Sequence, residues 1–93
     1  MTRKVRLAIS GPGWIGEQLM GAIHQHPGAE VAGVFGPNET SARASMQRVG
    51  IDQGLYVRDY AALLADSRVE GVVLSGPNAS HAPQAIAALA AGK

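Results

Sequence analysis

Apolar residues form short runs along this chain, and between the runs they recur at helical spacing. The runs cover residues 5–10, 30–35, 55–57 and 70–75, and β-branched residues are frequent in them. Such runs are typical of strands buried in a parallel sheet, and the stretches between them suit helices that cross over from strand to strand. The pattern therefore predicts an α/β domain with about four parallel strands, of which the third is a short edge strand.

Turn-forming residues bound the first predicted helix. It opens near Trp14 and stops at residues 26–28, where the sequence is His-Pro-Gly. Apolar residues at helical spacing support the assignment of this helix. They are Ile15, Leu19, Met20 and Ile23.

Capping residues locate the other helices. Asn38 or Thr40 is predicted to cap the second helix, which Gly50 closes. Asp59 caps a brief third helix, and Ser80 is predicted to cap a final alanine-rich helix. Helices and strands therefore alternate along the whole chain.

The handedness of crossover connections fixes the expected order of the strands. Right-handed crossovers and the usual 3-2-1-4 order give a doubly wound sheet with helices on both faces and the first and fourth strands adjacent. The loops after Ser10 and Ser75 then meet at the carboxyl ends of neighbouring strands, where such sheets bind ligands. The outer edge of the fourth strand is left uncovered, which offers a route to a homo-oligomer.

Three glycines with the spacing Gly-x-Gly-x-x-Gly directly follow the first strand. Gly11 permits a tight bend, Gly13 lets the backbone approach a ligand, and Gly16 lets the next helix lie close to the sheet. The helix N-terminus has unpaired N–H groups and a positive dipole end, which suit a pyrophosphate. The spacing alone arises easily in a chain with 12 glycines, so an ordinary glycine-rich turn stays an alternative. Between a strand and a helix, however, the motif predicts a dinucleotide site.

Composition limits the classes of function. Hydrophobic residues make up 46% of the chain and charged residues 16%, a balance typical of a folded domain. The net charge of +1 leaves no basic patch for nucleic acid. No apolar run is long enough for a membrane span, no signal peptide is visible, and cysteine is absent. We therefore expect a cytoplasmic protein that binds neither nucleic acid nor membrane.

Other groups of reactive residues do not form recognisable sites. His24 and His26 are two residues apart and lie on different faces of a helix, without an acid or cysteine to complete a metal site. Ser75 and His81 lack the Gly-x-Ser-x-Gly turn of hydrolases. The sequence thus predicts no metal ligand and no catalytic residue.

Residues 11–16, 31–35 and 72–81 carry a family resemblance, and the last segment, Val-Val-Leu-Ser-Gly-Pro-Asn-Ala-Ser-His, is the most specific. It precedes an alanine-rich helix that ends in Ala-Gly-Lys. With these segments the chain resembles, over essentially its whole length, the N-terminal half of the Gfo/Idh/MocA family of NAD(P)-dependent oxidoreductases. The resemblance implies a Rossmann-type fold. It also implies hydride transfer to or from a secondary alcohol or carbonyl, often of a sugar or cyclitol.

The resemblance places further residues near the cofactor. Pro77 and Asn78 would line the nicotinamide-ribose side, and His81 would lie near the ribose or the pyrophosphate. From the residues alone, a histidine in a first helical turn often only hydrogen-bonds locally, and Trp14 either flanks the cofactor or packs at the sheet edge. The predicted cofactor-binding residues are Gly11, Pro12, Gly13, Trp14, Ile15, Gly16, Gly36, Asn38, Thr40, Arg43, Ser75, Gly76, Pro77, Asn78 and His81.

The end of the second strand bears on the choice between NADP and NAD. NAD-preferring relatives carry an acid about 20 residues beyond the glycine motif, where it accepts hydrogen bonds from the ribose; here that position is Gly36. NADP is therefore the preferred cofactor, with NAD as the alternative. Glu39 is either a displaced ribose acceptor or an exposed acid at a helix N-terminus. The candidate donors to a 2′-phosphate are Asn38, Thr40, Ser41 and Arg43.

In the family, a further strand and a Glu-Lys-Pro segment with a catalytic lysine follow, and then an α/β substrate domain. Lys93 belongs to a helix end and is not that lysine. We interpret residues 1–93 as a partial NAD(P)-binding domain, inactive alone, whose small-molecule substrate binds only in the full-length protein. Two other hypotheses stay open: a non-catalytic dinucleotide-sensing or regulatory module, and a binder of S-adenosylmethionine or a mononucleotide.

Overall fold

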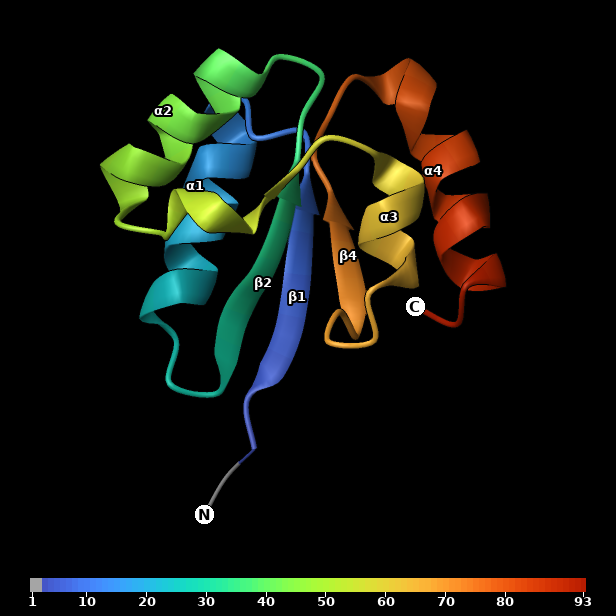
Figure 1. The fold of residues 1–93 in the computed structure, drawn as a ribbon, viewed down its shortest axis with the longest axis horizontal. Coiled ribbons are helices and arrows are strands. Elements are labelled where there is room, and N and C mark those ends of the chain that lie inside the picture. The colour runs from blue at the N-terminus through green and yellow to red at the C-terminus, as the bar shows by residue number, and fades with distance from the viewer. Residues whose placement is uncertain (1–2) are drawn as a thin grey trace.

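The apolar runs pair as one parallel sheet in the computed structural model, which describes residues 3–93. The strand order is β3-β2-β1-β4, which confirms the predicted 3-2-1-4 order (Figure 1). The elements in chain order are β1 (Val5–Ser10), α1 (Trp14–Gln25), β2 (Ala29–Phe35), α2 (Glu39–Val49), the 3-10 helix η1 (Gln53–Leu55), β3 (Tyr56–Val57), α3 (Tyr60–Ala65), β4 (Gly71–Leu74) and α4 (Asn78–Ala90). β4 forms one edge of this sheet, and pairing of that edge with another chain stays a prediction.

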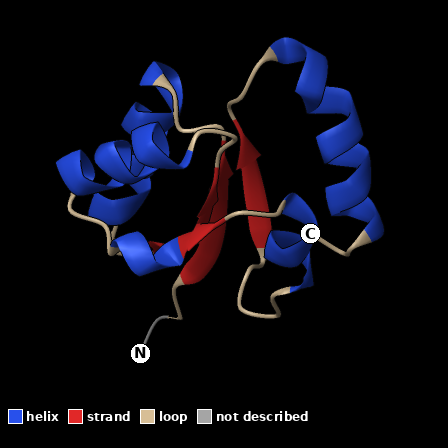
Figure 2. Ribbon diagram, turned by 45° about the horizontal axis from the view of Figure 1, so that its top comes forward, coloured by secondary structure: helices blue, strands red, loops and turns tan. Residues whose placement is uncertain are grey.

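Helices cover both faces of the sheet. α1 and α2 lie on one face, whereas α3 and α4 lie on the other (Figure 1 and Figure 2). Because successive side chains of a strand point to opposite faces, Ile9 packs with Met20 of α1 and Met46 of α2, while Ala8 packs with Leu63 of α3. All five side chains are at most 1% exposed. The sheet therefore separates two cores, and the predicted doubly wound, Rossmann-type fold is confirmed.

An irregularity in β2 adapts it to both cores. The pairing with β1 passes over one residue of β2, so Val31 and Val34, three positions apart, both pack in the core beneath α1 and α2. On the other face, a Cβ atom at Gly33 would lie 2.7 Å from Cδ1 of Leu63. The glycine in this strand thus lets α3 pack directly against the backbone.

A buried polar contact joins β1 to α4. The hydroxyl of Ser10, which is 1% exposed, donates to Oε1 of Gln84 at 2.8 Å. The carbonyl of Gln84 accepts from the hydroxyl of Tyr60 at 2.8 Å, and burial raises the pKa of Tyr60. Because each buried polar group has its partner, these bonds fix the position of α4 relative to β1 and α3.

The structure selects among the predicted helix caps. The side chain of Asn38 accepts from the N–H of Ser41 at 3.0 Å, so Asn38 rather than Thr40 caps α2. Gly50 closes that helix in the left-handed conformation, with φ +90°. Asp59 caps α3 by accepting from the N–H of Ala61. These predictions are confirmed.

The predicted cap of the last helix is wrong. α4 begins at Asn78, two residues before Ser80, and Pro77 stands at the capping position without a side-chain bond. The N–H of Ser80 already donates to the carbonyl of Pro77 at 2.9 Å, so Ser80 lies inside the first turn. The fixed φ of proline suits the entry to a helix, which removes the need for a serine cap.

Only some of the apolar positions that mark α1 in the sequence are buried. Ile15 and Leu19 are 60% and 39% exposed, whereas Met20 is fully buried and Gly16 is buried. The close approach of Gly16 to the loop after β1 turns that side of the helix inward. Half of the apolar positions that marked the helix thus face away from the sheet.

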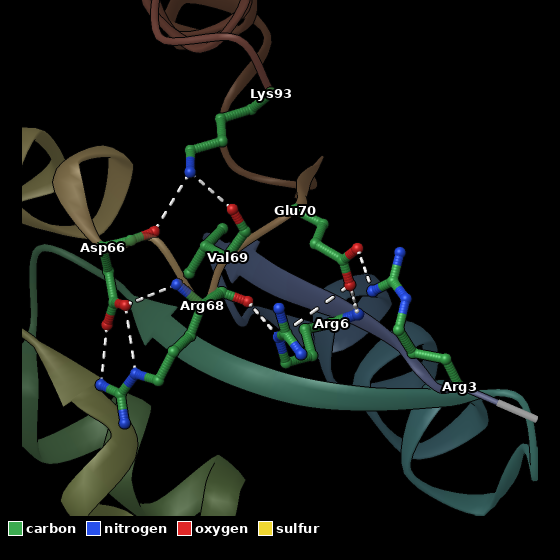
Figure 3. A network of polar contacts seen from close by, with 7 residues as sticks. All are labelled: Arg3, Arg6, Asp66, Arg68, Val69, Glu70 and Lys93. Atoms are coloured by element: carbon green, nitrogen blue, oxygen red, sulfur yellow. Dashed lines mark hydrogen bonds and ion pairs between the residues drawn. The ribbon is translucent and has the colours of Figure 1, made fainter.

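The first and last described residues are held at the amino end of the sheet (Figure 3). Lys93 donates through Nζ to the carbonyl oxygens of Asp66 at 3.1 Å and Val69 at 2.5 Å. Glu70 accepts a hydrogen bond from the guanidinium of Arg3. The amine of Lys93 therefore lies where β4 begins, at the end of the sheet opposite the loops that follow the strands.

Asp66 makes the stability of the fold depend on pH in the acidic range. Its side chain accepts from the guanidinium and the backbone N–H of Arg68, which hold the pKa of Asp66 at about 2, below its usual 3.8. Because the folded-state pKa is depressed, this stabilisation is fully present above the unfolded value and is lost as the pH falls toward 2. We expect the midpoint of thermal unfolding to fall across this window, and less steeply in an Asp66→Asn variant. Circular-dichroism melts at a series of pH values measure both slopes, and equal slopes would contradict the assignment.

Candidate functional site

The loops that follow β1, β2 and β4 converge at the carboxyl edge of the sheet (Figure 1). The N–H of Gly11 donates to the carbonyl of Phe35 at 2.8 Å, and the N–H of Ser75 donates to the carbonyl of Ser10 at 2.9 Å. The hydroxyl of Ser75 also donates to the carbonyl of Gly11 at 2.9 Å. The meeting of the loops after Ser10 and Ser75, predicted from the strand order, is thus confirmed.

Two of the motif glycines are required by space. Gly11 has φ +85°, and a Cβ atom there would lie 2.4 Å from Cα of Gly76. A Cβ atom at Gly16 would lie 2.4 Å from the carbonyl oxygen of Gly11 and 2.7 Å from Oγ of Ser75. Gly11 therefore makes the bend and Gly16 permits the close helix, as the sequence predicted.

Gly13 differs from these two glycines because it faces open space. A Cβ atom there would meet nothing within 4 Å. Gly13 is the N-cap residue of α1, and no side chain among the described residues caps this helix. The first N–H groups of α1, at Trp14 and Ile15, are therefore available to an anionic ligand.

A cavity of about 610 Å³ lies between the three loops. This volume is in the range of cofactor sites. Its lining side chains carry no formal charge, so backbone donors and the dipole of α1 supply the attraction for an anion. The lining residues are Gly11, Pro12, Gly13, Trp14, Ile15, Gly36, Pro37, Asn38, Ser41, Ala42, Ser75, Gly76 and Pro77.

Most of the predicted site residues line this cavity, but some do not. The predicted residues that lie outside the lining are Gly16, Thr40, Arg43, Asn78 and His81. Pro37 and Ala42 line the cavity without having been predicted, and Ser41 was predicted only as a donor. These residues could have been predicted from the cap at Asn38, because that cap places the first turn of α2 beside the loop after β2.

Gly36, the position at which an acid is expected in an NAD-preferring site, is closely surrounded. A Cβ atom there would lie 3.0 Å from Cδ of Pro12 and 3.4 Å from Cβ of Ala42. The carbonyl of Gly36 accepts from the hydroxyl of Tyr56 at 2.7 Å, which ties the loop to β3. Pro12 would have to shift by a few tenths of an ångström for a Cβ atom to fit at this position.

His81 acts on the loop after β4 and does not line the cavity. Its Nε2 hydrogen-bonds with the carbonyl of Gly76 at 2.6 Å, so the ring presents a protonated Nε2 to that oxygen. Gly76 and Pro77 line the cavity, and the bond fixes the peptide group that joins them. This local contact is the bond that a histidine in a first helical turn was expected to make.

Arg43 and Thr40 of α2 lie outside the cavity lining. The Nε of Arg43 donates to Glu39 at 2.8 Å, and its Nη1 donates to the carbonyl of Gln53 at 2.9 Å. Its guanidinium carbon lies 5.2 Å from the ring centroid of Tyr56. These contacts do not support the phosphate-binding role predicted for Arg43.

Glu17 stands in the first turn of α1, close to the proposed anion site, but its charge is engaged elsewhere. Its Oε1 accepts from Arg48 Nη2 at 2.7 Å and from the hydroxyl of Ser45 at 2.7 Å. The bonds from Arg48 and Ser45 lower the pKa of Glu17. Because α2 neutralises this carboxylate, it does not oppose an anion at the N-terminus of α1.

Residues 3–93 contain neither a membrane-spanning helix nor a cluster of metal ligands. No helix there combines the length and hydropathy needed to cross a lipid bilayer. No group of three or more His, Asp or Glu side chains in that range could hold a metal ion.

Residues 5–93 match the family model GFO_IDH_MocA, which describes an oxidoreductase family with an NAD-binding Rossmann fold. A search of curated proteins gave no match. The cavity-forming loops all lie within the matched range.

Solved structures superpose on nearly the whole chain. An NAD-binding protein from Listeria innocua is 35% identical, with a TM-score of 0.84 over 98% of this chain and 25% of its own. A putative myo-inositol dehydrogenase from Sinorhizobium meliloti is 27% identical, with a TM-score of 0.85 over 97% of this chain and 26% of its own. A mutant of KijD10, a 3-ketoreductase from Actinomadura kijaniata solved with TDP-benzene and NADP, is 26% identical, with a TM-score of 0.84 over 98% of this chain and 28% of its own. This chain spans about a quarter of the length of these proteins.

The glycine at position 11 should be indispensable to the fold. Gly11→Ala introduces a Cβ atom 2.4 Å from Gly76 Cα at a positive φ, so we expect the free energy of unfolding to fall by about 2–5 kcal/mol. Gly13→Ala is the matched control, because φ is −76° and the space is open; we expect a change below about 1 kcal/mol. Urea unfolding followed by circular dichroism measures both values, and equal losses would refute the close-approach argument.

Proposed function

The chain belongs to the Gfo/Idh/MocA family of oxidoreductases with an NAD-binding Rossmann fold, and on this basis we propose that the cavity at the carboxyl edge of its sheet binds the nicotinamide dinucleotide. One observation carries this proposal. The loops after β1, β2 and β4 line an open cavity at the carboxyl edge of the sheet. Here the adjacent strands β1 and β4 are followed by helices that lie on opposite faces of the sheet (Figure 1). The ligand of a doubly wound sheet binds at such a point.

The pyrophosphate is assigned to the N-terminus of α1. The open space at Gly13 lets phosphate oxygens approach the main chain, and the N–H groups of Trp14 and Ile15 donate to them. No lysine or arginine side chain lines the cavity, so binding at this point depends on backbone donors and the helix dipole.

The two nucleoside halves are assigned to the flanking loops. The nicotinamide ribose lies along residues 75–77, and the adenosine ribose lies along residues 36–38. His81 contributes by holding the carbonyl of Gly76, and Asn78 begins the helix behind this loop. In this arrangement both residues position the loop, while the loop itself contacts the cofactor.

NADP is the proposed preference over NAD. Glycine at position 36 brings no carboxylate to the ribose, which removes both an acceptor for its hydroxyl and a repulsive charge against a 2′-phosphate. Among the related structures, one is described as NAD-binding and another contains NADP. The preference must therefore come from residues particular to this chain.

For the whole protein we propose hydride transfer between the nicotinamide and a secondary alcohol or carbonyl of a sugar or cyclitol. The myo-inositol dehydrogenase and the 3-ketoreductase among the similar structures support this substrate class. The cavity lining offers no carboxyl, imidazole or amine group to transfer a proton. We therefore expect these residues to supply cofactor binding, and no dehydrogenase activity by themselves.

Trp14 allows direct measurement of cofactor binding. It is the one tryptophan of the chain, lines the cavity and is 79% exposed. We expect NADPH to quench its fluorescence and to bind more tightly than NADH, whereas S-adenosylmethionine leaves the emission unchanged. Fluorescence titration of the folded chain measures all three ligands. A folded sample that binds neither dinucleotide below about 1 mM would overturn the proposal.

The Gly13→Ala variant tests the pyrophosphate assignment. A methyl group at the open backbone position should separate the phosphates from the N–H groups, so we expect about tenfold weaker NADPH binding with the fold retained. Gly21→Ala is the control, because it also meets nothing within 4 Å but lies in the middle of α1, outside the cavity lining. The same fluorescence titration applies to both variants. Equal affinities in the two would place the pyrophosphate elsewhere.

A further inference from the structure

A cluster of three charged side chains stands at the start of α2. Oε2 of Glu39 accepts from Arg43 Nε at 2.8 Å, and Oε1 accepts from Arg58 Nη2 at 2.8 Å. The bond from Arg43, and then that from Arg58, holds the pKa of Glu39 below its usual range. Both carboxylate oxygens are therefore engaged, and the cluster has a net charge of +1.

This cluster adjoins the adenosine side of the proposed cofactor site. Phe35 of β2 pairs with Val57 of β3, so Arg58 follows β3 at the level at which Gly36 follows β2. Asn38, which lines the cavity, directly precedes Glu39 in the chain. The ion pair between Glu39 and Arg58 thus spans the gap between the ends of β2 and β3, beside the cavity.

The two arginines of the cluster differ in how firmly they are held. Arg43 contacts Glu39, the carbonyl of Gln53 and the ring of Tyr56, and its side chain is 38% exposed. The side chain of Arg58 is 84% exposed, and within residues 3–93 Glu39 is its one hydrogen-bond partner. A new anion could therefore recruit Arg58 at the cost of one exposed bond, whereas recruiting Arg43 would break three contacts.

Resting on the proposed function, in which the cavity binds a dinucleotide, we propose that Arg58 pairs with the 2′-phosphate of NADP and that Glu39 sets how strongly it does so. A guanidinium offers several N–H donors in a fork that matches two phosphate oxygens, so Arg58 can keep one donor on Glu39 while others reach the phosphate. Glu39 holds Arg58 near the ribose and also competes with the phosphate for it.

The two arginine bonds also make Glu39 a poor substitute for the acid that binds the ribose of NAD. Each oxygen of its carboxylate already accepts from an arginine, and the two positive charges offset its negative charge, so Glu39 is a weaker acceptor for ribose hydroxyls than a free acid. NADP, by contrast, gains an ionic partner without disturbing Arg43. The cluster therefore adds to the preference created by the absence of an acid at Gly36.

Substitution of Arg58 tests this assignment. We expect Arg58→Gln to weaken the binding of NADPH and of adenosine 2′,5′-bisphosphate by about tenfold, and to leave NADH and adenosine 5′-monophosphate unchanged. Removal of the competing carboxylate in Glu39→Gln should tighten NADPH about threefold without improving NADH. Arg68→Gln is the matched control, since Arg68 is 71% exposed and pairs with Asp66 at the opposite end of the sheet; it should change none of these affinities.

The outcomes separate this inference from the proposed function. Trp14 fluorescence gives the affinities for the dinucleotides, competition against NADPH gives those for the adenosine phosphates, and circular dichroism confirms that each variant is folded. If the unaltered chain binds neither NADPH nor NADH, the proposed function fails. If it binds both and Arg58→Gln weakens them equally or not at all, the function stands and the assignment of Arg58 is wrong. A selective loss of NADPH in a folded Arg43→Gln variant, with Arg58→Gln unaffected, would likewise overturn it.

Discussion

The contact between the loops after β1 and β4 determines much of this structure. Gly11 turns with a positive φ so close to Gly76 that a single Cβ atom would overlap the neighbouring backbone. Only because no side chain stands there can Ser75 bond to the backbone of Gly11 and Gly16 bring α1 against the same turn. The position of α1, the convergence of the loops and the opening of the cavity all follow from this close approach of two main chains.

The shape of the cavity and the charges near it come from different residues. The cavity lining is uncharged, so the space for the ligand is set by backbone and small side chains. Charged groups near it are bonded to one another: Glu17 pairs with Arg48, and Glu39 pairs with two arginines on the adenosine side. Exposed ion pairs contribute little to stability. Substitutions in these pairs can therefore alter the preference between related ligands without disturbing the fold.

The fold was largely predictable from the sequence, because strand runs, crossover helices and glycine turns are local patterns with few compatible topologies. Sequence patterns did not decide the structure where two residues suited the same role equally well. Ile15 and Leu19 matched the helical period as well as Met20 did, but contact with the loop at Gly16 decided which side of α1 is buried. Ser80 is a good cap residue in isolation, yet Pro77 had already started the helix.

The candidate site shows the same division. By itself, the sequence determined that a glycine turn follows a buried strand, that a second Gly-Pro loop follows another strand, and that no acid ends the second strand, since these depend on residue order alone. Only the tertiary structure decided which side chains are free to act: Arg43 is held by Glu39, Gln53 and Tyr56, His81 is bonded to Gly76, and Arg58 stays exposed. The physical reason is that a polar side chain takes the partners that folding brings within hydrogen-bond distance, and most of these are distant in sequence.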